Sequence, residues 1–287
     1  MDTMNKNTII FYHGNCPDGF TAAWAAWKKL GDSADYVPIV WNLIPGQIPE
    51  MKGKRVYFLD FTPREEDLSR VVEESDSVMV IDHHKTGEDQ IRRMTGSVYD
   101  DSHSGAVLAW KYFHPGEKVP ELSLYIEDGD TWRWQMSYAL EVLSYIFMKG
   151  DFDFKLWDEI ASDLEDKNRK KEYIEGGKLI VSFRERVIDK IIKDHAILVD
   201  FEGYEIYAIN ASRYFRSEVA NKLAKMKPPF AICWSYTKTD ISISLRSVEE
   251  FDLIPIVSKF GGGGHKSAVN IRLPFGAPLP WKIIKNE

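Results

Sequence analysis

The feature that most constrains the fold is an alternation in the first 130 or so residues. Short apolar runs of strand length are each followed by a helical pattern. Continuous apolar runs at 8–12, 56–59 and 78–81 predict buried strands. Apolar residues with helical spacing follow the first run, and residues 62–65, Thr-Pro-Arg-Glu, have the pattern of a capping box that begins a second helix. Ser104 is expected to cap a further helix. This alternation predicts βαβ units and a parallel sheet.

The pattern changes twice further along the chain. Residues 137–195 look helical, and the basic run at 167–171 is expected to be a solvated helix face. From 196 onward, strand patterns return at 196–199, 205–209, 230–234 and 241–245, with a helical segment near 217–225. We therefore predict an α/β protein with a parallel-sheet domain at 1–136, a helical spacer at 137–195 and a smaller α/β domain with a mixed sheet at 196–287.

Composition narrows the class of protein. Hydrophobic residues make up 44% and aromatic residues 13% of the 287 residues, enough for a packed core. Two cysteines allow no disulfide framework, and no run of about 18 apolar residues is present, so we expect a cytoplasmic protein without a membrane span. The net charge of −7 argues against a protein that coats long nucleic acid.

Aspartates and histidines gather where the predicted strands end. They are His13 and Asp18 after the first run, Asp60 after the second, and Asp82, His83 and His84 after the third. Asp128 and Asp130 follow a fourth apolar patch at 122–126 and can join them. One such residue is more often a cap or turn residue, but three strand ends together favour a metal site at the carboxyl edge of the sheet. Asp and His suit Mn²⁺ or Mg²⁺, and a shared Asp is suited to two ions that promote in-line displacement at phosphorus.

A second motif lies far along the chain. Four glycines at 261–264 are followed by His265, about 180 residues after the Asp-His-His motif at 82–84. Together with the strand-end residues, this pair of motifs resembles the DHH phosphoesterase superfamily, and most closely its oligoribonuclease-like branch. The resemblance covers nearly the whole chain. It implies a DHH metal-binding catalytic domain followed by a DHH-associated substrate-binding domain.

The resemblance also implies individual roles. Metal ligands, typically for Mn²⁺, would be His13, Asp18, Asp60, His83 and either Asp128 or Asp130, with Asp60 shared by two ions. Asp82 and His84 would be catalytic, with His84 close to the phosphate, and Ser104 would lie on the helix after the Asp-His-His loop and contribute to substrate binding. The chain departs from the family where Cys16 replaces the first carboxylate of the first motif. A neutral thiol coordinates Mn²⁺ poorly, so we expect one strong metal position and a weaker one near His13.

The last domain is expected to bind phosphate. Glycines let a backbone approach an anion closely, and Arg246 can bind a phosphate with two hydrogen bonds. The expected substrate contacts are Asn210, Arg213, Arg246, Gly262, Gly263, Gly264 and His265. Trp132 and Trp134 can stack on a base, but core packing is the favoured interpretation of this pair.

We therefore expect a Mn²⁺-dependent phosphodiesterase, with Mg²⁺ or another divalent cation as an alternative cofactor. Its substrate, a short oligonucleotide or a small linear or cyclic nucleotide, would lie between the domains. The alternatives are a phosphoanhydride hydrolase, a nucleotide-binding sensor without turnover, supported by Cys16, and an interaction module that uses the basic helix. The sequence leaves open the substrate length, the direction of attack and the oligomeric state.

Overall fold

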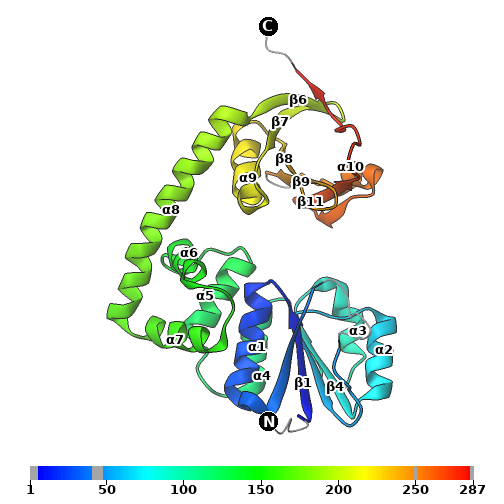
Figure 1. Ribbon diagram of the computed structural model, residues 1–287, viewed down its shortest axis with the longest axis vertical. Helices are drawn as coiled ribbons and strands as arrows, with labels where there is room; N and C mark the ends of the chain where they lie inside the picture. Colours follow the sequence, from blue (N-terminus) through cyan, green and yellow to red (C-terminus); the bar gives the residue numbers. More distant parts are fainter. Residues whose placement is uncertain (1–5, 41–47, 249–250, 285–287) are drawn as a thin grey trace. The chain divides into compact units, whose positions relative to one another are not determined.

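The computed structural model describes residues 6–40, 48–248 and 251–284, with the side chain of His265 outside the described part. The chain forms two compact units, Met1–Val181 and Ser182–Glu287 (Figure 1). The border between them falls inside the long helix α8 (Lys167–His195). Each unit is described by itself below.

A five-stranded parallel sheet forms the centre of the first unit, as the alternation of strand and helix patterns predicts. The strand order is β2-β1-β3-β4-β5. The strands are β1 (Thr8–His13), β2 (Ala34–Ile39), β3 (Arg55–Leu59), β4 (Ser77–Asp82) and β5 (Val98–Tyr99). Three of them match the predicted runs. Strand β2 lacks a continuous apolar run, since it contains Asp35 and Pro38, and β5 has two residues, so neither gives a sequence signal.

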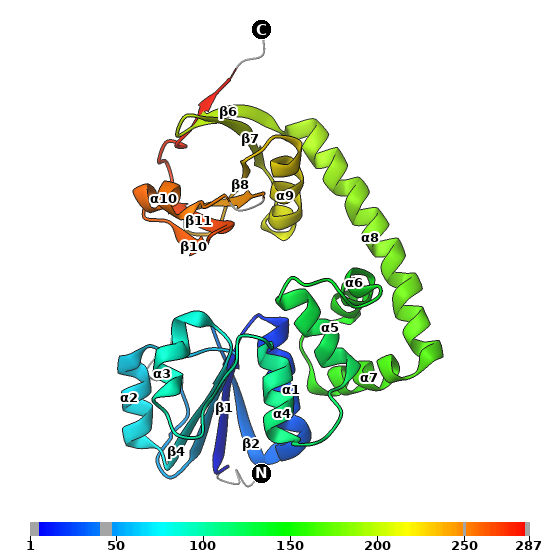
Figure 2. The ribbon, with the colours of Figure 1, turned by 180° about the vertical axis from the view of Figure 1, so that it is seen from behind.

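Helices cover both faces of this sheet (Figure 2). On one face lie α1 (Pro17–Leu30) and α4 (Gly105–Phe113), and on the other α2 (Glu65–Glu74) and α3 (Glu88–Arg92). Alternate residues of β1 enter different cores: Ile10 packs with α1 and α4, whereas Ile9 and Phe11 pack with α2 and α3. The continuous apolar strands are thus buried on both sides, as is typical of parallel sheets.

Two of the predicted helix starts differ from the structure. Helix α2 begins at Glu65 rather than after a Thr62 cap, and the Thr62 hydroxyl instead donates to Asp82 Oδ2 at 2.7 Å. Ser104 occupies the N-cap position of α4, but its side chain makes no capping hydrogen bond. For Thr62, a long-range contact near the carboxyl edge of the sheet therefore replaces the expected local cap.

Helices follow the sheet, as the pattern of 137–195 predicts. They are α5 (Glu121–Asp130), α6 (Ala139–Lys149), α7 (Phe154–Glu165) and α8. The apolar patch at 122–126 is helical, and Trp157 of α7 donates to Thr21 Oγ1 of α1 at 2.9 Å. Residues as far as Tyr173 belong to the core of the first unit, so packing continues past residue 136. The described residues contain no helix with the length and apolar character needed to cross a bilayer.

The second unit contains a seven-stranded mixed sheet, which confirms the predicted sheet type. The strand order is β10-β11-β9-β8-β7-β6-β12, and of the neighbouring pairs β7 and β8 run parallel. The strands are β6 (Ile197–Phe201), β7 (Tyr204–Asn210), β8 (Phe230–Tyr236), β9 (Ile241–Ser247), β10 (Gly263–His265), β11 (Ala268–Leu273) and β12 (Lys282–Ile283). Helix α9 (Arg216–Met226) packs with one face of the sheet, and α10 (Ile254–Val257) contributes to the core on the other face. Short 3₁₀ helices lie at Gly31–Ser33, Lys85–Gly87, Arg213–Phe215 and Ser258–Phe260.

The alternating strand β9 differs from a strand with one solvent-facing side. Its polar residues Ser242 and Ser244 are as buried as its apolar ones. Asn270 of β11 accounts for this, because its amide Nδ2 donates to both serine hydroxyls, at 3.0 and 3.1 Å, and to the Ile243 carbonyl at 3.0 Å. The polar face of the strand is therefore buried in a small hydrogen-bonded cluster.

Candidate metal centre

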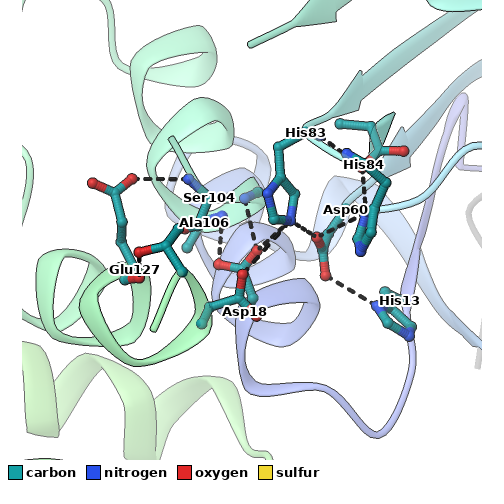
Figure 3. Close-up of polar contacts among 12 residues, drawn as sticks. His13, Asp18, Asp60, His83, His84, Ser104, Ala106 and Glu127 are labelled. Atoms are coloured by element: carbon teal, nitrogen blue, oxygen red, sulfur yellow. Dashed lines mark hydrogen bonds and ion pairs between the residues drawn. The ribbon is translucent and has the colours of Figure 1, made fainter. Parts of the chain in front are cut away.

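The ends of three neighbouring strands bring carboxylates and imidazoles together, as parallel strands should (Figure 3). His13 ends β1, Asp60 follows β3, and Asp82 ends β4 just before His83 and His84. Asp60 lies between two of the imidazoles: its Oδ2 is 3.1 Å from His13 Nδ1 and its Oδ1 is 3.2 Å from His83 Nε2. The structure thus joins residues that are up to 71 positions apart in the sequence.

Asp60 occupies an unusual backbone conformation. Its φ angle is +62°, in the left-handed region that Asp tolerates better than most residues. Its side chain is buried, and among the described residues its Oδ1 accepts no hydrogen bond of good geometry, although His83 Nε2 lies 3.2 Å from it in an ion pair. Burial alone would raise the pKa of Asp60, but the surrounding histidines lower it well below the ordinary carboxyl value. A buried, ionised oxygen without a good hydrogen bond is a good candidate ligand for a cation.

Asp18 connects the cluster to helix α4. Its carboxylate accepts the backbone N–H groups of Gly105 at 2.7 Å and Ala106 at 3.0 Å, and so caps α4 in place of Ser104. Its Oδ2 also lies 3.8 Å from His83 Nε2. Burial, followed by the negative charges of Asp60 and Asp130, raises the pKa of Asp18 well above its usual value. Such crowding of carboxyl groups is relieved when a cation binds among them.

Gly105 makes this close approach possible and was missed in the sequence. A Cβ atom at this position would lie 2.6 Å from Asp60 Cβ and 2.9 Å from Asp18 Oδ2. The first turn of α4 therefore lies against both carboxylates, and a side chain at this position would displace them. No local pattern marks this glycine, because its neighbours in space are 45 and 87 residues away in the sequence.

Asp82 holds the histidine loop in place. Its Oδ1 accepts the backbone N–H groups of His83 at 2.7 Å and His84 at 3.1 Å, and it lies 2.7 Å from His84 Nδ1. Its Oδ2 accepts the Thr62 hydroxyl. The hydrogen bond from Asp82 raises the pKa of His84 to about 9. These contacts give both carboxylate oxygens of Asp82 a partner. Asp82 engages His84 through Nδ1 and not through Nε2, which favours a positioning role for Asp82.

The structure distinguishes Asp130 from Asp128. Asp130 Oδ2 lies 3.7 Å from His83 Nε2, within the cluster. Asp128 accepts the backbone N–H groups of Gln135 at 2.8 Å and Met136 at 3.0 Å, and therefore holds the loop after α5. Asp130 is the better candidate ligand. Burial and the charge of Asp60 raise the pKa of Asp130.

Three overlapping groups of these side chains have ligand atoms within 4.8 Å of one another: Asp18, His83 and Asp130; His13, Cys16 and Asp60; and Asp60, Asp82, His83 and His84. Oxygen and imidazole donors of this kind fit divalent cations such as Mn²⁺ and Mg²⁺. The second group contains the thiol of Cys16. Burial, then the charge of Asp60, raises the pKa of Cys16, so the thiol stays protonated and is a weak ligand.

Glu127 positions the start of α4 beside the cluster, and the sequence analysis did not identify it. This buried carboxylate accepts the Ser104 backbone N–H at 2.8 Å and lies 3.0 Å from His103 Nδ1. It also lies 3.5 Å from Arg133 Nη1. The Ser104 hydroxyl is buried and has no hydrogen-bond partner within the described residues. Glu127 thus fixes the start of α4, the segment whose amides hold Asp18.

Arginines gather in the second unit. Arg246 donates to Ser217 Oγ at 3.1 Å and to the Leu245 carbonyl at 2.9 Å, and burial together with nearby Arg216 lowers its pKa. Burial, then the charge of Arg213, also lowers the pKa of Arg216. Within 6–40, 48–248 and 251–284, no carboxylate forms an ion pair with any of these three guanidinium groups. Arg216 was missed, although it stands one helical turn after Arg213.

The other residues expected to bind substrate divide into two sets. Asn210 donates to the Trp234 carbonyl at 3.1 Å, and the strand register places it on the opposite sheet face from Arg246. Gly262 and Gly264 allow close packing on β11, because a Cβ at either would lie 2.5–2.7 Å from a backbone oxygen. Gly263 faces open space. The backbone of His265 pairs with Ala268, which in turn pairs with Arg246, while its side chain lies outside the described part.

Comparisons with curated proteins give two distant relatives, whereas no protein-family model matches the chain. An uncharacterized protein of Acanthamoeba polyphaga mimivirus is 27% identical over 282 residues, which cover 91% of this chain and 66% of the relative. Oligoribonuclease NrnB of Bacillus subtilis is 23% identical over 229 residues, which cover 71% of this chain and 55% of that protein. The chain therefore spans just under two thirds and just over half of these relatives.

Solved structures show the same fold. An exopolyphosphatase-related protein from Bacteroides fragilis has a TM-score of 0.57 at 15% identity, covering 95% of this chain and 87% of that one. Exonuclease RecJ bound to manganese has a TM-score of 0.52 at 13% identity, covering 93% and 86%. The pGpG-specific phosphodiesterase PggH from Vibrio cholerae has a TM-score of 0.51 at 14% identity, covering 94% of both chains. At 13–15% identity, these likenesses show that the chain shares the fold of these three proteins.

Proposed function

We propose that the protein is a metal-dependent phosphodiesterase that hydrolyses short oligonucleotides or small, including cyclic, nucleotides. The observation that carries this proposal is the buried Asp60 carboxylate, shared between two groups of potential metal ligands, with one oxygen that accepts no hydrogen bond of good geometry among the described residues. An oxygen of this kind suits a cation, and a cation beside a second one suits phosphoryl transfer. NrnB, RecJ and PggH carry names of nucleotide-cleaving enzymes, which supports the proposal.

Asp18, Asp60, His83 and Asp130 would hold one divalent cation, for which Mn²⁺ is the first choice, and His13, Cys16 and Asp60 a weaker one. When bound, such ions neutralise charge on a phosphate and lower the pKa of a bound water. Asp82 keeps His84 protonated near neutral pH, because it raises the pKa of that imidazole to about 9. His84 can therefore donate a proton from Nε2 to the ester oxygen that leaves as the phosphorus–oxygen bond breaks.

The arginines of the second unit indicate what else the substrate carries. Arg213, Arg216 and Arg246 form a concentration of positive charge without carboxylate partners in the part of the chain that the structure describes, and guanidinium groups bind phosphate well. We propose that they bind a phosphate that is not cleaved. Since the whole chain carries a net charge of −7, the positive surface is local, which favours a short substrate over a long duplex.

Two other functions have some support. The exopolyphosphatase-related protein shares the fold, and a phosphoanhydride would use the same metal ligands. The protonated Cys16 would weaken one metal position, which would suit a nucleotide sensor without turnover. These alternatives predict different products: inorganic phosphate from pyrophosphate in the first case, and tight binding without release of mononucleotide in the second.

A substrate panel tests the proposal. Purified protein with Mn²⁺ is incubated with adenosine 3′,5′-bisphosphate, a linear dinucleotide, a pentanucleotide, a cyclic dinucleotide and pyrophosphate. We expect cleavage of at least one nucleotide substrate, loss of activity in excess EDTA, and better recovery with Mn²⁺ than with Ca²⁺, which prefers more oxygen ligands. His83→Ala is the matched inactive control. Full activity in EDTA, or cleavage of pyrophosphate alone, would contradict the proposal.

A further inference from the structure

The segment between α5 and α6, residues 131–138, carries two tryptophans that the core does not use. Trp132 is 62% exposed and Trp134 is 37% exposed. Their ring centroids lie 5.2 Å apart, with the planes at 75°. Core packing, the interpretation favoured from the sequence, is therefore wrong for Trp132. Two neighbouring exposed indoles form an apolar surface that is costly to leave in water unless it has a ligand.

The backbone of this segment is held in a strained form. Trp132 and Trp134 have φ angles of +57° and +52°, in the left-handed region that is unfavourable for non-glycine residues. Buried Asp128 maintains it: its carbonyl accepts the N–H groups of Arg133 at 3.0 Å and Trp134 at 3.4 Å, and its carboxylate accepts the next two N–H groups. Four contacts to one residue thus fix the directions in which the indoles leave the backbone.

The segment is also tied to the metal centre. Asp130, whose carboxylate lies 3.7 Å from His83 Nε2, precedes Trp132 by two residues, so their Cα atoms lie within about 8 Å of one another. Arg133 donates to the Ser102 carbonyl at 2.5 Å and pairs with Glu127, which itself holds the start of α4. The indoles therefore stand on a rigid support that is continuous with the candidate ligands.

We propose that Trp132 and Trp134 form a stacking platform for the nucleobase adjacent to the phosphate that is cleaved. This inference rests on the proposed function and adds a part of the substrate that the metal ligands cannot recognise. A base presents a flat π surface whatever its identity, so an indole platform binds nucleotides with little sequence preference. Pyrophosphate has no such surface and gains nothing from it.

The test compares two substrates that differ only in their bases. One is a 5′-phosphorylated dinucleotide, and the other is the same backbone with abasic sugars. In the Trp132→Ala protein we expect kcat/KM on the dinucleotide to fall by about 5- to 150-fold, as is typical of a lost base–aromatic stack. We expect no change on the abasic substrate, and a smaller loss with Trp132→Phe. Phe147→Ala, which removes an aromatic ring of similar exposure from α6, is the control and should behave as the wild type.

Equilibrium binding of the dinucleotide to metal-free protein, measured by calorimetry, gives a second readout and should weaken in the same order. Equal losses on both substrates would mean that the segment only positions Asp130, and would overturn the inference. An unchanged kcat/KM on the dinucleotide would overturn it as well. If the wild type cleaves pyrophosphate but no nucleotide, the proposed function fails and the stacking platform fails with it, whereas the first two outcomes leave the proposed function intact.

Discussion

Single residues carry most of the chemistry, and Asp60 is the most demanding of them. Asp60→Asn keeps the size of the side chain and the tolerance for a left-handed backbone, but removes the charge. We expect this variant to fold and to lose more than about 100-fold in turnover, because loss of a mere partner of a metal ligand already costs 10- to 100-fold. Mn²⁺-dependent hydrolysis and the melting temperature in EDTA measure the two effects separately. Wild-type turnover would show that the site is misassigned.

The thiol of Cys16 offers a gain of function. Because burial raises its pKa, it lies beside His13 and Asp60 as a neutral group. Cys16→Asp would place a charged oxygen ligand there and should lower the Mn²⁺ concentration for half-maximal activity by about tenfold or more. Cys16→Ser, which adds no charge, is the matched control. Two equally tight Mn²⁺ ions in the wild type, measured by metal analysis, would contradict this expectation.

The protons of the metal-free cluster make cation binding depend on pH. The pKa of His84 is raised to about 9. Burial alone would lower the pKa of His83, but the interaction with Asp60 outweighs this effect, so the pKa of His83 is raised too. Protonated His83 and His84 add to the free energy of unfolding of the metal-free protein below pH 6.5, and this contribution declines as pH rises toward 9. Mn²⁺ competes with these protons, so its affinity should rise over the same interval. Calorimetry in two buffers of different ionisation enthalpy should detect released protons; none released at pH 7 would contradict the expectation.

The sequence predicts most residues of this cluster, but not the residues that hold the cluster in position. Strand ends meet at one sheet edge by geometry, so His13, Asp60 and His83 could be grouped without a structure. Asp128 and Asp130 could not be separated, because what distinguishes them is which one accepts the N–H groups of the following loop. Glu127 acts on Ser104, 23 residues away, and no spacing rule reports such a contact.

At the scale of elements, the first turn of α4 packs directly against the Asp18 and Asp60 carboxylates. Gly105→Ala would place a Cβ 2.6 Å from Asp60 Cβ, an atom attached directly to the backbone, and 2.9 Å from Asp18 Oδ2. We expect Mn²⁺ binding to fall below detection. We also expect the free energy of unfolding to fall by about 1–3 kcal/mol, which lowers the melting temperature. Gly150→Ala is the control, since its Cβ would meet only the end of the Leu156 side chain, at 3.2 Å. Normal Mn²⁺ affinity in Gly105→Ala would show that α4 does not confine the site.

The elements also show where sequence patterns fail. The apolar runs give β1, β3 and β4, because strands buried on both faces have no polar alternation. The supposed cap at Thr62 is misleading, since a hydroxyl can serve either its own helix or a distant carboxylate. In this protein the carboxylate of Asp82 takes it, at 2.7 Å.

At the scale of the whole molecule, the two units have separate cores. The first half of α8 packs with the first unit through Tyr173, and the second half packs with the second unit through Ile188 and Ile192. We expect two calorimetric transitions, of which Mn²⁺ at about 100 times its dissociation constant shifts one by about 5–11 °C. The shifted transition should be absent in Asp60→Asn. A single transition that shifts as a whole would show that the units unfold together.

The border between the units could not be placed from the sequence. A continuous helical pattern runs across Val181 and Ser182, and nothing in a pattern of helical spacing tells which core each turn joins. The division into 1–136, 137–195 and 196–287 therefore remains a prediction.

The buried cluster of Asn270 and the two serines of β9 has a consequence for folding fidelity. Asn270 pairs with Ser244 in the ladder, so a slip of β11 by one residue would turn its amide toward the apolar side of the sheet. There it would meet the environment of Ile243 and Leu245 and lose its three acceptors. An amide without partners in such a place costs about 1–3 kcal/mol, a penalty on the misregistered pairing of β9 with β11 that an all-apolar strand would not carry. One asparagine thus selects the correct strand alignment while the sheet assembles.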